Sequence, residues 1–269
     1  MTKEEAGCIV PPSQLHRTHV ADLAAFIEYC GDKLRVPGRS KDGSGGISTI
    51  YWSKGSAAAV GLFYFAKDTP FYATLVDKYI SSVILYEPPT SAVFGLDPGE
   101  CAHALFWDKL KEPTEDTNLI FAKYVSGFYK NSWEYLANKG GRQVLSYYRA
   151  GVLEPNFQEY FAKVSEPEYT PAILHWFLVD NEAERSEACH EAFREMAKSS
   201  LKTVGILWGA EGLPECVEGS WLAEKWLNQE AAKIGQESKA RTKQFPGGNH
   251  YVQFYDPHGF WNAIIQTSS

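Results

Sequence analysis

Three residues in this sequence, Ser53, Glu87 and His250, are of the types that carry out nucleophilic catalysis together. A serine hydroxyl attacks a carbonyl carbon when an imidazole accepts its proton and a carboxylate orients that imidazole. Each of the three follows a segment that we predict to be a β-strand. Because the carboxyl ends of parallel strands meet at one edge of a sheet, we expect the three side chains to converge there.

Ser53 lies at a predicted corner between a strand and a helix. β-Branched and aromatic residues predominate in Ile47–Tyr51, and the small residues of Ser56–Val60 favour a helix just beyond. A serine at such a corner projects from the sheet, and the backbone N–H of the next residue, Lys54, can donate to an oxyanion. The motif for this corner is G-x-S-x-G, and Tyr51 replaces its first glycine. A serine that caps an ordinary helix therefore explains this stretch equally well.

Two further segments supply a carboxylate and a base. The hydrophobic run Val83–Tyr86 is typical of a buried parallel strand, and it ends at Glu87, where two prolines stop the strand. His250 follows the polar, edge-like strand Ala240–Phe245, in a Gly-Gly-Asn turn. Taken alone, Glu87 is also consistent with a surface glutamate, and His250 with a loop histidine that has no role. The order serine, acid, histidine along the chain favours the catalytic interpretation.

The remaining pattern predicts an α/β fold with a helical insertion. Residues 1–96 and 171–269 are expected to form the core, and residues 97–170, where aromatic-rich helical segments replace the strand runs, are expected to form a helical cap. One further strand is predicted at Lys202–Trp208. The further predicted helices are His16–Cys30, a helix after Pro70 that continues to about Ser82, Thr170–Val179, Ala183–Ser199, Val217–Ile234 and Pro257–Gln266.

Composition and charge narrow the class of protein. Hydrophobic residues make up 44% and charged residues 22% of the 269 residues, which is typical of a globular protein. The net charge of −7 argues against a nucleic-acid partner. No run approaches the roughly 18 apolar residues of a membrane span, and the N-terminus does not read as a signal peptide, so we expect a cytoplasmic protein. The five cysteines are scattered without a C-x-x-C motif, which favours free thiols and gives no indication of a metal.

Four segments together resemble the α/β-hydrolase family. YWSKGSAAAVGL (51–62) resembles its nucleophile corner, and VILYEPPT (83–90) resembles the strand end of some members. LKTVGILWGAEG (201–212) and FPGGNHYVQFYDPHGFWNAI (245–264) resemble its closing segments. The resemblance implies a mostly parallel sheet and the hydrolysis of an ester or lactone of a hydrophobic small molecule through an acyl-serine, without a metal or organic cofactor. Ser53 would attack, His250 would act as base and then acid, and the Lys54 N–H would stabilise the oxyanion.

Two acids compete for the role of orienting the histidine. Many family members carry an aspartate three residues after the glycine that follows the penultimate strand. Here that position is Gly212, with Glu211 beside it. An acid at the end of the strand after the corner is similar to the placement in zearalenone-type lactonases, and there the chain has Glu87. We favour Glu87 and keep Glu211 as the alternative.

The resemblance also implies a sheet that is shortened at its N-terminal side. Residues 5–12 resemble the loop after the fourth strand of the family, so the strand before Ser53 is expected to be an edge, and the second oxyanion donor is not visible. A catalytically silent relative that binds a ligand or a partner is therefore the rival interpretation, and a lid-covered C–C hydrolase would use the same triad. The sequence leaves open whether copies of the chain form a homo-oligomer.

Overall fold

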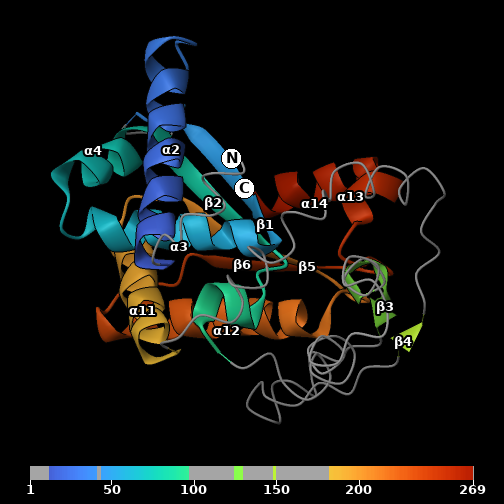
Figure 1. Ribbon diagram of the computed structural model, residues 1–269. Helices are drawn as coiled ribbons and strands as arrows, with labels where there is room; N and C mark the ends of the chain where they lie inside the picture. The colour runs from blue at the N-terminus through green and yellow to red at the C-terminus, as the bar shows by residue number, and fades with distance from the viewer. Residues whose placement is uncertain (1–11, 41–43, 97–123, 130–147, 150–181, 269) are drawn as a thin grey trace, which may run out of the picture.

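The computed structural model describes residues 12–40, 44–96, 124–129, 148–149 and 182–268 (Figure 1). Its main feature is a four-stranded sheet in the order β1-β2-β5-β6, in which every neighbouring pair is parallel. The strands are β1 (Ile47–Trp52), β2 (Ile80–Tyr86), β5 (Thr203–Gly209) and β6 (Ala240–Phe245). Because all four run the same way, their carboxyl ends lie at one edge of the sheet, as the sequence predicts.

Helices surround this sheet and connect its strands (Figure 1). The larger ones are α2 (Pro12–Asp32), α3 (Ser56–Ala66), α4 (Pro70–Tyr79), α11 (Glu182–Lys198), α12 (Pro214–Lys233) and α14 (Pro257–Ser268). Short helical turns are η1 (Ser53–Gly55), η2 (Thr90–Phe94) and α13 (Val252–Tyr255). The two-residue strands β3 (Phe128–Tyr129) and β4 (Tyr148–Arg149) form a separate antiparallel pair.

Side chains of β2 and β5 alternate between two hydrophobic cores. The larger core packs against α2, α3, α4, α11 and α12, and the smaller core packs against α13 and α14. Val83, Leu85, Val204 and Ile206 face the larger core, whereas Ile84, Tyr86 and Leu207 face the smaller one. A strand that is buried on both faces is mostly hydrophobic, and each fully buried aliphatic side chain contributes about 1.5–3 kcal/mol.

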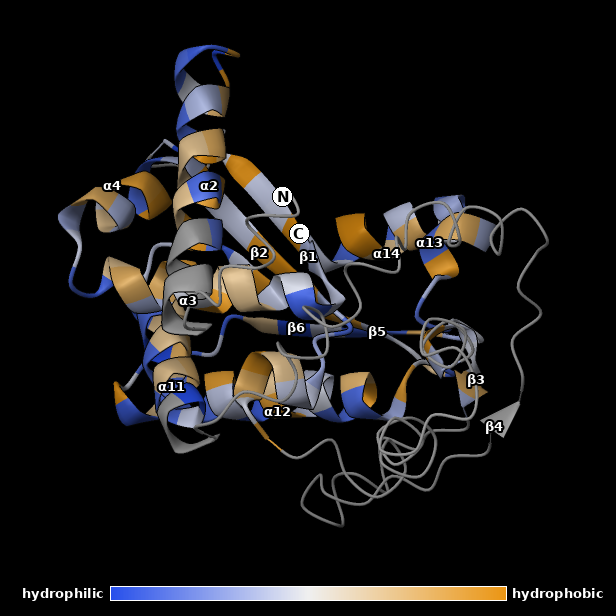
Figure 2. Ribbon diagram, viewed as in Figure 1, coloured by the Kyte–Doolittle hydropathy of each residue, from blue (hydrophilic) through white to orange (hydrophobic). Residues whose placement is uncertain are grey.

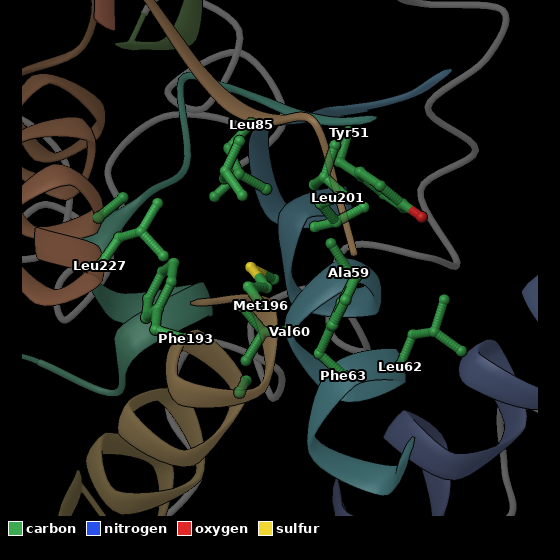
Figure 3. Packing of buried hydrophobic residues seen from close by; sticks show 14 of the residues in the cluster. Tyr51, Ala59, Val60, Leu62, Phe63, Leu85, Phe193, Met196, Leu201 and Leu227 are labelled. Carbon is green, nitrogen blue, oxygen red and sulfur yellow. The ribbon is translucent and has the colours of Figure 1, made fainter. Parts of the chain in front are cut away.

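Helix α3 lies close against the sheet because its residues are small. Ala57, Ala59 and Val60 are buried in the larger core, and Figure 3 shows Ala59 and Val60 with Tyr51 and Leu85 of the strands. Figure 2 shows α3 mostly in hydrophobic colours, in keeping with a helix that is covered by α2 and α11 as well as by the sheet.

The two outer strands differ from the two inner ones. β6 carries Arg241 and Lys243, which are typical of a protected sheet edge. β1 pairs only with β2 among the described strands, and its Ser48 and Ile50 are exposed. The prediction that the strand before Ser53 forms an edge is confirmed for the described part of the chain.

Three sequence predictions differ from the structure or lie outside it. We predicted helix to about Ser82, but α4 ends at Tyr79, and β2 begins at Ile80 without a loop. Ser81 and Ser82 lie in the strand, where the hydroxyl of Ser82 is 2.6 Å from that of Ser48 in β1. The cap, 97–170, is described only at 124–129 and 148–149, and the helix 170–179 lies outside the described residues. None of the described helices combines the length and hydrophobicity of a membrane span.

Candidate active site

Ser53 occupies a sharp corner between β1 and α3. Its φ of +54° lies in the left-handed region, which residues other than glycine rarely adopt and which costs about 1–3 kcal/mol. The turn η1 begins at Ser53, and the buried hydroxyl of Ser56 donates to the carbonyl of Tyr51 across the corner (3.2 Å). The strained corner therefore forms although Tyr51 stands where the motif has glycine. Lys54, the proposed oxyanion donor, follows Ser53 within the same turn.

Glu87 follows the neighbouring strand and is fully buried. It too has a left-handed backbone, with a φ of +49°. The Oε1 atom of its carboxylate accepts a hydrogen bond from the backbone N–H of Gly209 at the end of β5 (2.9 Å). The Oε2 atom lies 2.5 Å from Nδ1 of His250, a short hydrogen bond between two buried side chains. One carboxylate thus links the ends of β2 and β5 to the loop after β6.

The loop after β6 holds His250 rigidly. The Asn249 side chain donates to the carbonyl of Ser126 (3.0 Å) and accepts from the N–H of Tyr251 (2.9 Å). The hydroxyl of Tyr86, at the end of β2, lies 3.2 Å from the carbonyl of Asn249 and 3.3 Å from that of His250. His250 is only 3% exposed, so its ring is fixed against Glu87.

Aromatic rings lie beside His250 on the side of the corner. The ring of Trp52, the residue before Ser53, is centred 5.2 Å from the His250 ring. Tyr251 lies 5.3 Å from His250, and Phe254 lies 6.2 Å from Trp52. Such rings offer apolar surface to a ligand. The Ser53 hydroxyl makes no hydrogen bond to His250 or to any other described residue, and hydrogen bonds between a nucleophile and its base are often loose before substrate binds.

The alternative acid, Glu211, has a different environment. Its backbone N–H donates to the carbonyl of Gly248 (2.8 Å), and its carbonyl accepts from the N–H of Tyr129 (3.0 Å). It is half-buried, and the hydrogen bond of the His250 ring goes to Glu87 instead. The structure thus brings Glu87 and His250 together and leaves Glu211 in the turn after β5.

Cys216 is a buried neighbour of this pair that sequence reasoning missed. Burial raises the pKa of its thiol well above the usual value, and the nearby carboxylates of Glu87 and Glu215 add to the rise. No spacing in the sequence connects Cys216, in the first turn of α12, with the ends of β2 and β6.

Two glycines beside Glu87 were also missed as parts of the site. A Cβ on Gly209 would lie 2.9 Å from Oε1 of Glu87, and a Cβ on Gly212 would overlap the same atom. Both belong to the Gly-Ala-Glu-Gly turn, whose small residues were the available signal.

The parallel sheet, with a serine corner, an acid and a histidine at its carboxyl edge, is consistent with an α/β-hydrolase fold, and a solved structure supports that fold. The chain has an α/β-hydrolase fold. A bromoperoxidase from Bacillus anthracis matches with a TM-score of 0.52 at 10% identity, over 91% of this chain and 72% of that chain. An α/β hydrolase enzyme from a deep-sea metagenome library matches with a TM-score of 0.46 at 11% identity, over 91% of this chain and 70% of that chain. A haloalkane dehalogenase from Bradyrhizobium elkani matches with a TM-score of 0.45 at 16% identity, over 93% of this chain and 75% of that chain.

At these identities the comparison concerns the fold alone. No protein-family model matches the sequence, and no curated protein matches it.

Proposed function

We propose that the chain is a serine hydrolase that cleaves an ester or lactone of a hydrophobic small molecule. The observation that carries this proposal is the buried hydrogen bond of 2.5 Å between Glu87 and His250, beside the strained corner at Ser53. Backbone strain of this kind persists only where the surrounding structure enforces it, and it gathers at functional sites.

In the proposed reaction each group has its own role. The carboxylate of Glu87 accepts the Nδ1 proton of His250, which leaves Nε2 as a proton acceptor for Ser53. The Ser53 oxygen then attacks the carbonyl carbon, and the N–H of Lys54 stabilises the oxyanion. His250 returns the proton to the leaving alcohol, and a water molecule, activated in the same way, releases the acid from the acyl-serine.

The aromatic rings around His250 support a hydrophobic substrate. Trp52, Tyr251 and Phe254 form an apolar border to the corner, and Phe254 is 57% exposed. A ligand that covers these rings would remove apolar surface from water, at about 25 cal/mol per Å².

A catalytically silent, ligand-binding relative is the second candidate. The unpaired outer edge of β1 among the described strands favours it, together with Tyr51 in place of the motif glycine. Loss of one oxyanion donor costs about 100- to 1,000-fold in rate, so a site with a single donor would be slow.

Labelling with a fluorophosphonate separates the two candidates. The purified chain is treated with the probe, and the labelled peptide is mapped, with Ser53→Ala as the control. We expect labelling at Ser53 and Ser53-dependent hydrolysis of short p-nitrophenyl esters. A folded chain that hydrolyses no ester and is not labelled at Ser53 would favour the binding protein.

A further inference from the structure

A third metal-binding side chain lies against the Glu87–His250 pair. The Cys216 sulfur, a carboxylate oxygen of Glu87 and a ring nitrogen of His250 all lie within 4.8 Å of one another. They come from the first turn of α12, the end of β2 and the loop after β6, and all three residues are buried. Thiolate, carboxylate and imidazole are the ligands that Zn²⁺ takes in proteins.

We propose that Glu87, Cys216 and His250 form a binding site for a thiophilic divalent cation such as Zn²⁺, and that the bound cation switches the hydrolase off. The binding site stands on the cluster alone, whereas the switch rests on the proposed function.

Charge and geometry both suit this cation. A thiolate and a carboxylate neutralise its two charges, and the imidazole is neutral, so the buried site carries no net charge. Ligand atoms around a tetrahedral Zn²⁺ are about 3.3–3.8 Å apart, so the His250–Glu87 pair must widen by roughly 1 Å. The Cys216 sulfur forms neither a disulfide nor a hydrogen bond to a described residue, so no such bond has to break when a cation binds it. The N–H of Gly209 holds the other oxygen of Glu87, as outer partners of metal ligands do.

Binding removes the general base. The cation takes the place of the proton between His250 and Glu87, and that proton moves to Nε2 of the same ring. Nε2 then has no lone pair for the proton of Ser53. The Cys216 thiol releases its proton to solvent, so one proton leaves the protein for each cation bound.

Titration of the full chain with Co²⁺ and with Cd²⁺ tests the site directly. A thiolate ligand produces a charge-transfer band in the near ultraviolet for Co²⁺ and further in the ultraviolet for Cd²⁺. We expect this band for the wild type, with one cation bound per chain, and its loss in Cys216→Ser. The matched control is Cys189→Ser, because Cys189 is an equally buried thiol that donates to the Val93 carbonyl instead (3.0 Å). This control should keep the band.

Ester hydrolysis is followed in the same samples after incubation with Zn²⁺. We expect the activity of the wild type to fall at least tenfold as the site fills, and to return when a chelator removes the cation. The activity of Cys216→Ser should not fall on addition of Zn²⁺, compared with the activity of the same variant without Zn²⁺. No charge-transfer band in a wild type that hydrolyses esters would overturn the metal site and leave the proposed function intact. Full occupancy without loss of hydrolysis would overturn the switch. A Cys216-dependent band in a chain that hydrolyses no ester would support the metal site and count against the proposed function.

Discussion

The carboxylate of Glu87 occupies the space that a side chain at position 212 would need. A Cβ built on Gly212 would overlap Oε1 of Glu87. The resemblance to α/β hydrolases makes position 212 the common place of the triad acid, one strand away from the end of β2. An acid at position 212 and the buried Glu87 therefore exclude each other in this chain, and the glycine at position 212 leaves the space that the Glu87 carboxylate occupies.

Replacing Gly212 by alanine should damage the site without touching a catalytic residue. The new Cβ pushes the Glu87 carboxylate, and a displacement near 1 Å can cost about 100-fold in turnover. The matched control is Gly55→Ala in the corner motif, where a Cβ meets no described atom within 4 Å and φ is −57°. Ester hydrolysis should fall by about 100-fold in the first variant and stay within a few-fold in the second. Equal activities would contradict this account of Gly212.

The pair Glu87→Gln and Glu211→Gln separates the two candidate acids. An amide at position 87 keeps the size of the side chain, but its oxygen accepts from the Gly209 N–H and its NH2 group then faces Nδ1 of His250. This favours the wrong tautomer of the imidazole, so kcat should fall by up to about 10,000-fold. Glu211 does not hydrogen-bond to the His250 ring, and its variant should keep near-normal kcat. Steady-state kinetics on one ester would show this, and the reverse pattern would move the acid to Glu211.

Moving the acid across the two strands should partly restore activity. Glu87→Gly removes the carboxylate and suits the left-handed φ of +49° at that position. Gly212→Asp then has the vacated space for its side chain. We expect the double variant to exceed Glu87→Gly by at least tenfold in kcat/KM, whereas Gly212→Asp alone should be as poor as Gly212→Ala. A double variant no better than Glu87→Gly would show that position 212 cannot orient His250.

The strands, most helix positions and the convergence of Ser53, Glu87 and His250 toward one edge could be predicted from the sequence. Hydrophobic runs mark β2 and β5 because both faces of these strands are buried. The turn from α4 into β2 was misplaced because Ser81 and Ser82 carry little strand signal. Their placement depends on pairing with β1, which is a tertiary effect.

The close packing around Glu87 could not be predicted. Cys216 lies 129 positions from Glu87 in the sequence and approaches it only because α12 starts beside the end of β2. The overlap at Gly212 depends on the rotamer of one carboxylate. Such contacts follow from how elements pack, and local pattern does not contain that information.

The hydroxyl of Tyr86 should matter more for turnover than for stability. It lies within 3.3 Å of the His250 carbonyl and holds the histidine loop to β2. Tyr86→Phe should cost about 1 kcal/mol of unfolding free energy, and kcat should fall roughly tenfold because His250 loses its position. The matched control is Tyr79→Phe, whose hydroxyl bonds to Asp32 (3.4 Å) away from the site, and it should lose only stability. Urea unfolding with ester kinetics would separate the two effects, and equal kcat values would contradict the positioning role.

Tyr51→Phe should stabilise the chain, and more so at high pH. The Tyr51 hydroxyl is buried without a hydrogen-bond partner among the described residues, so its removal should gain about 1–2 kcal/mol. Burial raises the pKa of Tyr51 from 10.0 to about 12, opposed by the nearby Thr49 hydroxyl, whose own hydrogen bond goes to the Ser82 carbonyl (3.3 Å).

The unfolded chain therefore ionises Tyr51 near pH 10, two units before the folded chain does. Between these values the unfolded state gains from ionisation, so the wild type loses stability as the pH rises from 10 to 12, and Tyr51→Phe is spared this loss. Urea unfolding of both proteins at pH 7 and pH 11 measures the difference, which should be about 1 kcal/mol larger at pH 11. Ionisation of the other tyrosines is common to both proteins and cancels. A difference that does not grow with pH would mean that Tyr51 is not buried as the structure has it.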